Sequence, residues 1–183
     1  MVEQGPERIK FNSSISEPVV IVDSREQKPY TFDLPTVVQG LKCGDYSVQG
    51  YEGQISIERK STDDLIGSIS TGRPRFEREL QRGQDLEYFA LVVEASLQDL
   101  AMGRYTSRMN PRSVVQTLVA FSVRYRLPIW FSGSRGYAAR ITESLLLKYM
   151  REVERKTRHV EATGKPLFRS GGFRDHGDED SNA

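Results

Sequence analysis

The sequence predicts one α/β domain, because strand-like and helix-like patterns alternate along it. The runs Val19–Val22 and Tyr88–Glu94 are almost entirely apolar, which is typical of strands covered on both faces. Segments 111–125 and 134–158 repeat apolar residues every three or four positions, which indicates helices with one apolar face. With 37% hydrophobic and 28% charged residues among 183, the chain can bury one sizeable core.

Both ends of the chain lack a periodic pattern. We therefore expect a flexible arm at residues 1–17, a folded domain at 18–160 and a disordered tail at 161–183. No eighteen apolar residues run together and no signal peptide is recognisable. We accordingly expect no membrane segment and an intracellular location, either cytoplasmic or with the DNA of a nucleoid or nucleus.

Composition excludes some classes of site. Cys43 is the only cysteine, which excludes an internal disulfide and a cysteine-based zinc site. The net charge of +1 provides no general basic attraction for nucleic acid, so any such binding must come from local groups.

The first strand ends in charged residues. The run Val19–Val22 delivers Asp23, Arg25 and Glu26 to its carboxyl end, and in open α/β sheets ligands bind at that edge. A strand that simply ends in a charged turn fits the same pattern. The next segment, 34–41, contains a proline and predicts either a brief helix or an irregular crossing.

Residues 44–64 predict a β-hairpin. Val, Ile and Tyr residues flank the polar stretch 49–54, whose two glycines suit a hairpin loop of more than two residues. If Val48 pairs with Ile55 across that loop, one register fixes which residues of the two strands face each other.

That register brings Asp45, Glu58 and Lys60 together. Asp45 lies opposite Glu58, and Glu58 shares a face with Lys60 because side chains alternate along a strand. Two carboxylates that face each other repel unless positive charge lies near, and a hard divalent cation such as Mg²⁺ or Mn²⁺ meets that need. The hairpin is therefore our candidate active site. The alternative is a solvated charged cluster that protects an edge strand.

Two helix starts follow the hairpin. Ser61 and Asp64 have the spacing of a capping box, so Asp64 belongs either to the helix cap or to the site. Pro74 suits the first turn of a second helix. A helix start beside the acids is a natural seat for phosphate, although ion pairs with nearby glutamates explain the arginines equally well. The candidate DNA-binding residues here are Arg73, Arg75 and Arg78.

The later segments complete the predicted sheet and its covering helices. We expect Tyr88–Glu94 to lie beside the first strand, a short helix to begin near Leu97, and 129–131 to form a short strand. The helix at 134–158 has a broad apolar face, which fits either a partner surface or ordinary packing on the sheet.

The hairpin motifs resemble those of the XPF-type structure-specific nucleases, which belong to the restriction-endonuclease-like superfamily. The likeness rests on Gly44-Asp45, on Glu58-Arg59-Lys60 and, after three further residues, on Asp64. Upstream Val22-Asp23-Ser24-Arg25-Glu26 and downstream 64–69 with Gly72-Arg73 extend it. The resemblance covers roughly residues 19–155 and is specific mainly between 23 and 73.

The resemblance implies a three-layer fold with a central mixed sheet and helices on both faces. It also implies a divalent-metal-dependent endonuclease that acts on branched, forked or flapped DNA in repair or recombination. The implied metal ligands are Asp23, Asp45, Glu58 and the main-chain carbonyl of Arg59, with Lys60 assisting water or the transition state and Arg25, Glu26 and Asp64 in support.

The sequence departs from this family in one respect. XPF-type nucleases usually follow the nuclease domain with a tandem helix-hairpin-helix module, and here only the tail follows. We therefore expect a homodimer or a helper protein. Two alternatives stay open. One is a non-catalytic DNA-binding or scaffold subunit, although such chains lose the motif acids that this sequence keeps. The other is a nuclease of the same fold without branch specificity.

Overall fold

The computed structural model describes residues 17–167. Its strands are β1 (Val20–Asp23), β2 (Thr36–Gln39), β3 (Tyr46–Val48), β4 (Ile55–Lys60), β5 (Tyr88–Val93) and β6 (Ile129–Phe131). Its helices are α1 (Thr62–Ile69), α2 (Arg73–Gly83), α3 (Leu97–Ala101), α4 (Pro111–Arg124) and α5 (Arg135–Thr163). The chain forms two compact units that divide between Tyr149 and Met150, and the sheet belongs entirely to the first.

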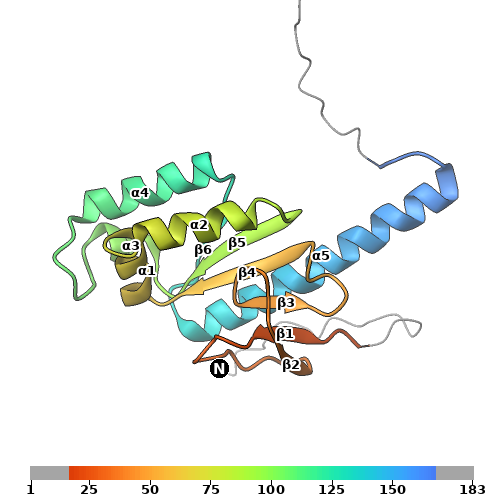
Figure 1. Ribbon diagram of the computed structural model, residues 1–183, viewed down its shortest axis with the longest axis horizontal. Coiled ribbons are helices and arrows are strands. Elements are labelled where there is room, and N and C mark those ends of the chain that lie inside the picture. The colour runs from red at the N-terminus through yellow and green to blue at the C-terminus, as the bar shows by residue number, and fades with distance from the viewer. Residues whose placement is uncertain (1–16, 168–183) are drawn as a thin grey trace, which may run out of the picture. The chain divides into compact units, whose positions relative to one another are not determined.

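The sheet is mixed and runs in the order β2-β1-β3-β4-β5-β6 (Figure 1). β3 pairs antiparallel with both of its neighbours, whereas every other pairing is parallel. The carboxyl ends of β1, β4 and β5 consequently meet at one edge, where ligands bind in open α/β sheets.

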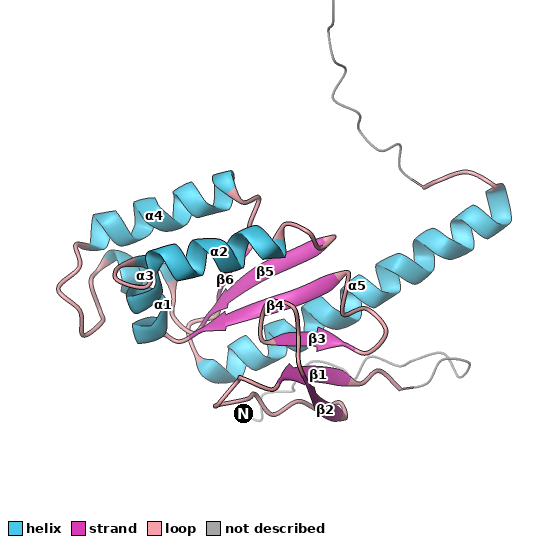
Figure 2. Cartoon of the chain, in the orientation of Figure 1, coloured by secondary structure: helices cyan, strands magenta, loops and turns pink. Residues whose placement is uncertain are grey.

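Helices cover both faces of the sheet (Figure 2). Alternation along β4 separates the two faces: Lys60 lies over Phe76 of α2, whereas Arg59 points the other way and shares Glu94 with Arg135 at the start of α5. This arrangement confirms the predicted α/β class with a central mixed sheet between helical layers.

The main apolar core lies where α1, α2 and α4 pack with β5. α4 begins at Pro111, as the sequence predicts, and the side chain of the preceding Asn110 accepts hydrogen bonds from two amides of the first turn. The apolar stripe predicted for this helix is buried in the core. Its residues are Val114, Leu118, Phe121 and Tyr125.

Three expectations about the elements differ from the structure. β5 lies between β4 and β6 rather than beside β1, because the β3–β4 hairpin inserts between them. Residues 36–39 form an exposed edge strand paired with β1, not a helix or an irregular crossing. α5 continues to Thr163, beyond the helix end that the sequence predicts at residue 158.

The predicted terminal segments fall mostly outside the described residues. This applies to the arm at residues 1–17, of which 1–16 are not described, and to the tail beyond residue 167. Between residues 17 and 167, no helix is both long and apolar enough to cross a membrane.

Candidate active site

β3 and β4 form the predicted hairpin in the predicted register. Tyr46 pairs with Ile57, so Asp45 lies opposite Glu58. The Asp45 amide donates to the Ile57 carbonyl at 2.9 Å. Gly44 makes this close approach possible, because its φ is +75° and a Cβ there would collide with a serine side chain of β4. The glycine of the motif is therefore a structural requirement for placing the first acid.

Glu58 is buried and Asp45 is half-buried. Burial raises the pKa of Glu58, which is 5% exposed, and the Lys60 ammonium 2.5 Å from its Oε1 opposes that shift. Burial, and then the charge of Glu58, raise the pKa of Asp45 to about 8. A hydrogen bond of 2.7 Å from the Arg59 amide to Asp45 Oδ2 acts in the other direction. The two acids therefore make each other's ionisation more costly.

Lys60 supplies a fixed cation to this pair. Burial would lower the pKa of Lys60, but the carboxylate of Glu58 raises it overall. Its Nζ also lies 5.2 Å from the centre of the Phe76 ring, which limits where the ammonium can move. The structure thus brings together the three hairpin residues that the sequence singled out.

These groups line a cleft of about 590 Å³. Its walls come from the loop after β1, from β4 and from the facing helices α1 and α2. A cleft that combines buried acids with cations suits a phosphodiester, whose own charge needs positive partners. The lining cations are Arg25, Lys28, Arg59, Lys60 and Arg75, and the lining acids are Glu26, Asp45, Glu58, Asp63, Asp64 and Glu79.

Asp23, a predicted ligand, lies outside the residues that line this cleft. Its carboxylate accepts hydrogen bonds from the Arg25 amide (2.9 Å), from Arg25 Nε and Nη2 (2.7 and 3.1 Å) and from the Leu41 amide (2.6 Å). Burial acts to raise the pKa of Asp23, but these bonds bring it below its ordinary value. In this structure Asp23 orients Arg25, which does line the cleft.

Glu26 brings a further carboxylate into the cleft from the same loop. Its Oε1 accepts from the Lys28 amide at 2.6 Å, and its Oε2 lies 3.7 Å from Arg59 Nη1. The two supporting residues predicted after β1, Arg25 and Glu26, therefore both reach the site.

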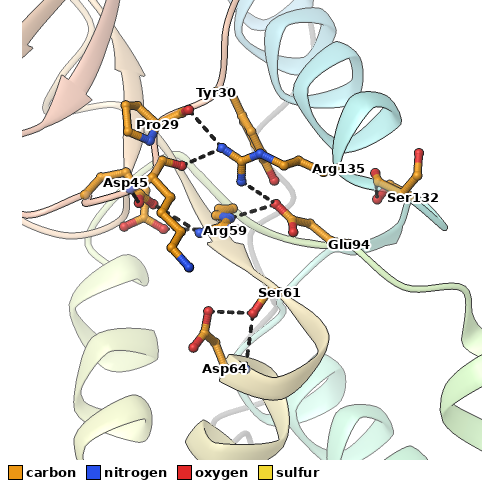
Figure 3. Close-up of polar contacts among 12 residues, drawn as sticks. Pro29, Tyr30, Asp45, Arg59, Ser61, Asp64, Glu94, Ser132 and Arg135 are labelled. Carbon is orange, nitrogen blue, oxygen red and sulfur yellow. Dashed lines mark hydrogen bonds and ion pairs between the residues drawn. The ribbon is translucent and has the colours of Figure 1, made fainter. Parts of the chain in front are cut away.

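Asp64 combines the two interpretations that the sequence left open. Its amide donates to Ser61 Oγ at 3.3 Å, and the Ser61 hydroxyl donates to Asp64 Oδ2 at 2.5 Å (Figure 3). This is the predicted capping arrangement for α1. Asp64 also lines the cleft, because the start of α1 forms part of its wall.

The three arginines of α2 occupy different positions. Arg75 lines the cleft, whereas Arg73 and Arg78 do not. Arg73 Nε donates to Glu77 at 2.9 Å, and its guanidinium lies 5.2 Å from the Phe121 ring centre. It therefore ties α2 to α4, and Arg78 is exposed elsewhere on the helix.

Sequence reasoning missed three residues that surround Arg59 (Figure 3). Glu94 accepts hydrogen bonds from both Arg59 and Arg135, and both guanidinium groups lie over the ring of Tyr30. One signal was available: Glu94 is an acid at the carboxyl end of a buried strand, beside the end of β4. Nothing in the sequence marked Tyr30 or Arg135.

The donor atoms at the hairpin fit a hard divalent cation. The Asp45 and Glu58 carboxylates and the Arg59 carbonyl offer only oxygen, which Mg²⁺ and Mn²⁺ prefer. Burial is the main cause of the raised pKa of both acids, and a bound cation would stabilise their ionised forms. Within residues 17–167, no three His, Cys, Asp or Glu side chains are spaced to bind a metal together. A main-chain carbonyl or water would therefore complete the ligand set.

Comparison with known proteins identifies related folds. A family model described as the ERCC4 domain matches residues 22–145. XPF from Aeropyrum pernix has a similar structure, with 23% identity and a TM-score of 0.59 over 72% of this chain and 61% of that one. XPF from Aeropyrum pernix in complex with DNA is 23% identical, with a TM-score of 0.58 over 74% of this chain and 66% of that one. The chain thus spans less than two thirds of the length of these structures. No curated protein sequence matches it.

Proposed function

The chain belongs to the ERCC4-domain family, and on that premise we propose that it is a divalent-metal-dependent DNA endonuclease. The bonds it hydrolyses are phosphodiesters in branched, forked or flapped DNA, of the kind met in repair and recombination. The observation that carries the proposal is the pair of acids, half-buried Asp45 and buried Glu58, which face each other beside Lys60 in a cleft. The structure of the similar XPF in complex with DNA supports DNA as the partner.

Asp45, Glu58 and the Arg59 carbonyl are the groups that would hold Mg²⁺ or Mn²⁺. The metal supplies charge neutralisation and polarisation of the phosphoryl group when it is bound. Lys60 favours the ionised form of Glu58 and holds its carboxylate in position through a 2.5 Å contact, and its ammonium is available to developing charge on a phosphate. Asp23 acts as a positioning residue for Arg25 in this proposal, because its carboxylate accepts hydrogen bonds from the Arg25 side chain and from the Leu41 amide.

Phosphate groups of the DNA are held by cations on opposite walls of the cleft. Arg25 and Lys28 come from the loop after β1, and Arg75 comes from α2. Arginine side chains suit this role because their planar fork matches phosphate oxygens. Arg73 and Arg78 contribute from outside the cleft, where longer DNA would pass.

The test compares fork, 3′-flap and linear duplex substrates with Mg²⁺, Mn²⁺ or excess EDTA. We expect cleavage of the branched substrates with either metal, and loss of cleavage in EDTA, in Asp45→Asn and in Glu58→Gln. Asp85→Asn is the matched control, because its carboxylate pairs with Lys42 at the exposed surface, 3.2 Å away and outside the cleft. It should cleave like the unaltered protein.

The outcomes separate the alternative functions. DNA binding without cleavage under all metal conditions would favour the non-catalytic scaffold subunit. Equal cleavage of linear and branched substrates would favour a nuclease without branch specificity. Full activity in excess EDTA would contradict a metal-dependent mechanism. The proposed location is the compartment that contains the DNA, which is the cytoplasm, the nucleoid or the nucleus.

Self-association is a further part of the proposal. Most of the apolar stripe of α4 is buried in the core. A dimer interface on this helix would therefore involve its exposed apolar residues, Val119 and Val123, which lie one turn apart. Val123 is 77% exposed. The same helix face on a second copy can cover it through a two-fold axis. We expect light scattering at micromolar protein to give a dimer, which Val123→Glu should dissociate. A monomeric mass for the unaltered protein would count against this interface.

A further inference from the structure

The loop at residues 24–35 forms one wall of the cleft. It contributes Arg25, Glu26, Gln27 and Lys28 to the lining, yet it has no helix or strand of its own. Loops are usually more mobile than the elements they join. Contacts from outside the loop are therefore needed to hold this wall in place when DNA enters the cleft.

Arg135, the first residue of α5, supplies such a restraint. Its Nη2 donates to the carbonyl oxygens of Lys28 at 2.7 Å and of Pro29 at 2.8 Å. Its guanidinium lies 4.9 Å from the centre of the Tyr30 ring, which stacks on Tyr46 of β3 at 5.0 Å. One arginine thus contacts three consecutive residues in the middle of the loop (Figure 3).

Glu94 links this arginine to the hairpin. It directly follows β5, and its Oε1 accepts from Arg135 Nη1 at 3.0 Å and from Arg59 Nε at 2.8 Å. The Arg59 amide in turn donates to Asp45 Oδ2 at 2.7 Å. A continuous series of contacts therefore runs from the start of α5, through Glu94 and Arg59, to a candidate metal ligand.

Charge makes these contacts depend on one another. Two guanidinium groups share the Glu94 carboxylate, whose side chain is 11% exposed, and the Arg59 side chain is 9% exposed. Buried charges are stable only when they are paired, so removing Glu94 would leave Arg59 without its closest carboxylate. Removing Arg135 would release the two loop carbonyls while Glu94 still holds Arg59.

We propose that Glu94 and Arg135 are positioning residues for the nuclease reaction, an inference that rests on the proposed function. They act through the loop and through Arg59 rather than by touching DNA. Arg135 fixes the wall formed by residues 25–28, and Glu94 fixes the strand end that carries Arg59. Together they fix the loop wall relative to the end of β4, which carries the candidate metal ligands.

The test uses Arg135→Met and Glu94→Gln in the full chain. Four quantities are measured: the single-turnover cleavage rate at saturating branched DNA with Mn²⁺, the DNA Kd in Ca²⁺, amide hydrogen exchange in residues 24–34, and the melting temperature. We expect the rate at saturation to fall by roughly 10- to 100-fold, since small misplacements near reacting groups have effects of that order. Exchange in residues 24–34 should become faster in Arg135→Met, and Kd should change much less than the rate.

Two further variants make the comparison specific. Arg140→Met removes an arginine from the same helix whose guanidinium lies over Tyr137, 5.6 Å away, and it should change none of the four quantities. Arg135→Lys keeps the charge but lacks the planar fork, so it should restore only part of the rate.

Several results would overturn the inference. Normal cleavage by Arg135→Met and Glu94→Gln well below their melting temperatures would mean that these residues only stabilise the fold. Unchanged exchange in residues 24–34 of Arg135→Met would mean that the arginine does not hold the loop. If the unaltered protein cleaves no DNA with either metal, the proposed function fails instead, and the exchange data alone decide whether the loop is held as inferred.

Discussion

The proximity of Asp45 and Glu58 has a consequence for the stability of the metal-free protein. Asp45→Asn removes one negative charge but keeps an oxygen that can accept the hydrogen bond from the Arg59 amide. The folded variant no longer buries an ionised Asp45 beside Glu58. We therefore expect it to be at least as stable as the unaltered protein, and more stable at alkaline pH, although it loses cleavage.

The magnitude follows from the pKa of Asp45, which rises from 3.8 to about 8 in the fold. The folded chain then binds the proton more tightly than the unfolded chain does, so this group lowers stability progressively as pH rises from about 4 towards 8. One pKa unit corresponds to about 1.4 kcal/mol, so the rise from 3.8 to about 8 sets an upper limit of about 6 kcal/mol. Because Glu58 shares the proton equilibrium, we expect a gain of roughly 1–3 kcal/mol for the variant near pH 8.5.

The assay is urea and thermal unfolding in EDTA at about pH 4, 7 and 8.5, compared with unfolding in Mn²⁺. The two proteins should differ little in unfolding free energy at the lowest pH, and Asp45→Asn should become the more stable of the two as pH rises. For a chain of this size, 1 kcal/mol shifts the melting temperature by roughly 2–4 °C. Mn²⁺ should stabilise the unaltered protein by mass action and the variant less.

Two results would refute this reasoning. If Asp45→Asn were less stable at every pH and followed the same pH slope, the acids would not oppose each other's ionisation. If it cleaved DNA at the normal rate, the hairpin would not be the active site. Asp85→Asn, which removes a surface carboxylate paired with Lys42, is the control and should show no pH-dependent gain.

Three other variants, one of them with a control, test separate parts of the site. Lys60→Ala should lose cleavage by on the order of 10² while Mn²⁺ still raises its melting temperature, which melting and single-turnover assays check in parallel. Gly44→Ala should lose roughly 2–4 kcal/mol of stability in urea unfolding, because the residue has a positive φ and a Cβ there would collide with a neighbouring side chain. Its control is Gly50→Ala, which has φ +87° but open space around it and should lose about 1 kcal/mol. Equal losses would contradict the collision. Asp23→Asn should lose roughly 1–3 kcal/mol at neutral pH, and the deficit should disappear at acid pH as the native carboxylate is protonated; a deficit independent of pH would contradict the ion pair with Arg25.

The parts of the site that depend on neighbouring residues were predictable from the sequence. Pairing across one hairpin loop fixed the positions of Asp45 and Glu58, because register follows from strand alternation once the loop is identified. The Ser61–Asp64 cap was equally predictable, since it spans a single helical turn.

The parts that depend on distant residues were not predictable. Arg135 contacts the Lys28 carbonyl across 107 positions, and Glu94 contacts Arg59 across 35. No local pattern records such pairs, because they form only when the sheet brings the ends of β4 and β5 beside α5. The predicted position of β5 was wrong for a related reason. A strand pattern indicates burial, but it does not show that the β3–β4 hairpin lies between β1 and β5 in the sheet.

Asp23 and Asp45 illustrate how environment divides similar residues between roles. Both aspartates lie at the same edge of the sheet, and the Asp23 amide donates to the Asp45 carbonyl at 2.8 Å. Asp23 is surrounded by donors, so its negative charge is already compensated and its pKa is lowered. Burial, and then the charge of Glu58, raise the pKa of Asp45, and its one backbone hydrogen bond, from the Arg59 amide, does not offset them. A cation therefore gains more from binding at Asp45 than at Asp23. This difference, which residue type alone does not reveal, supports Asp45 as a metal ligand and Asp23 as the residue that orients Arg25.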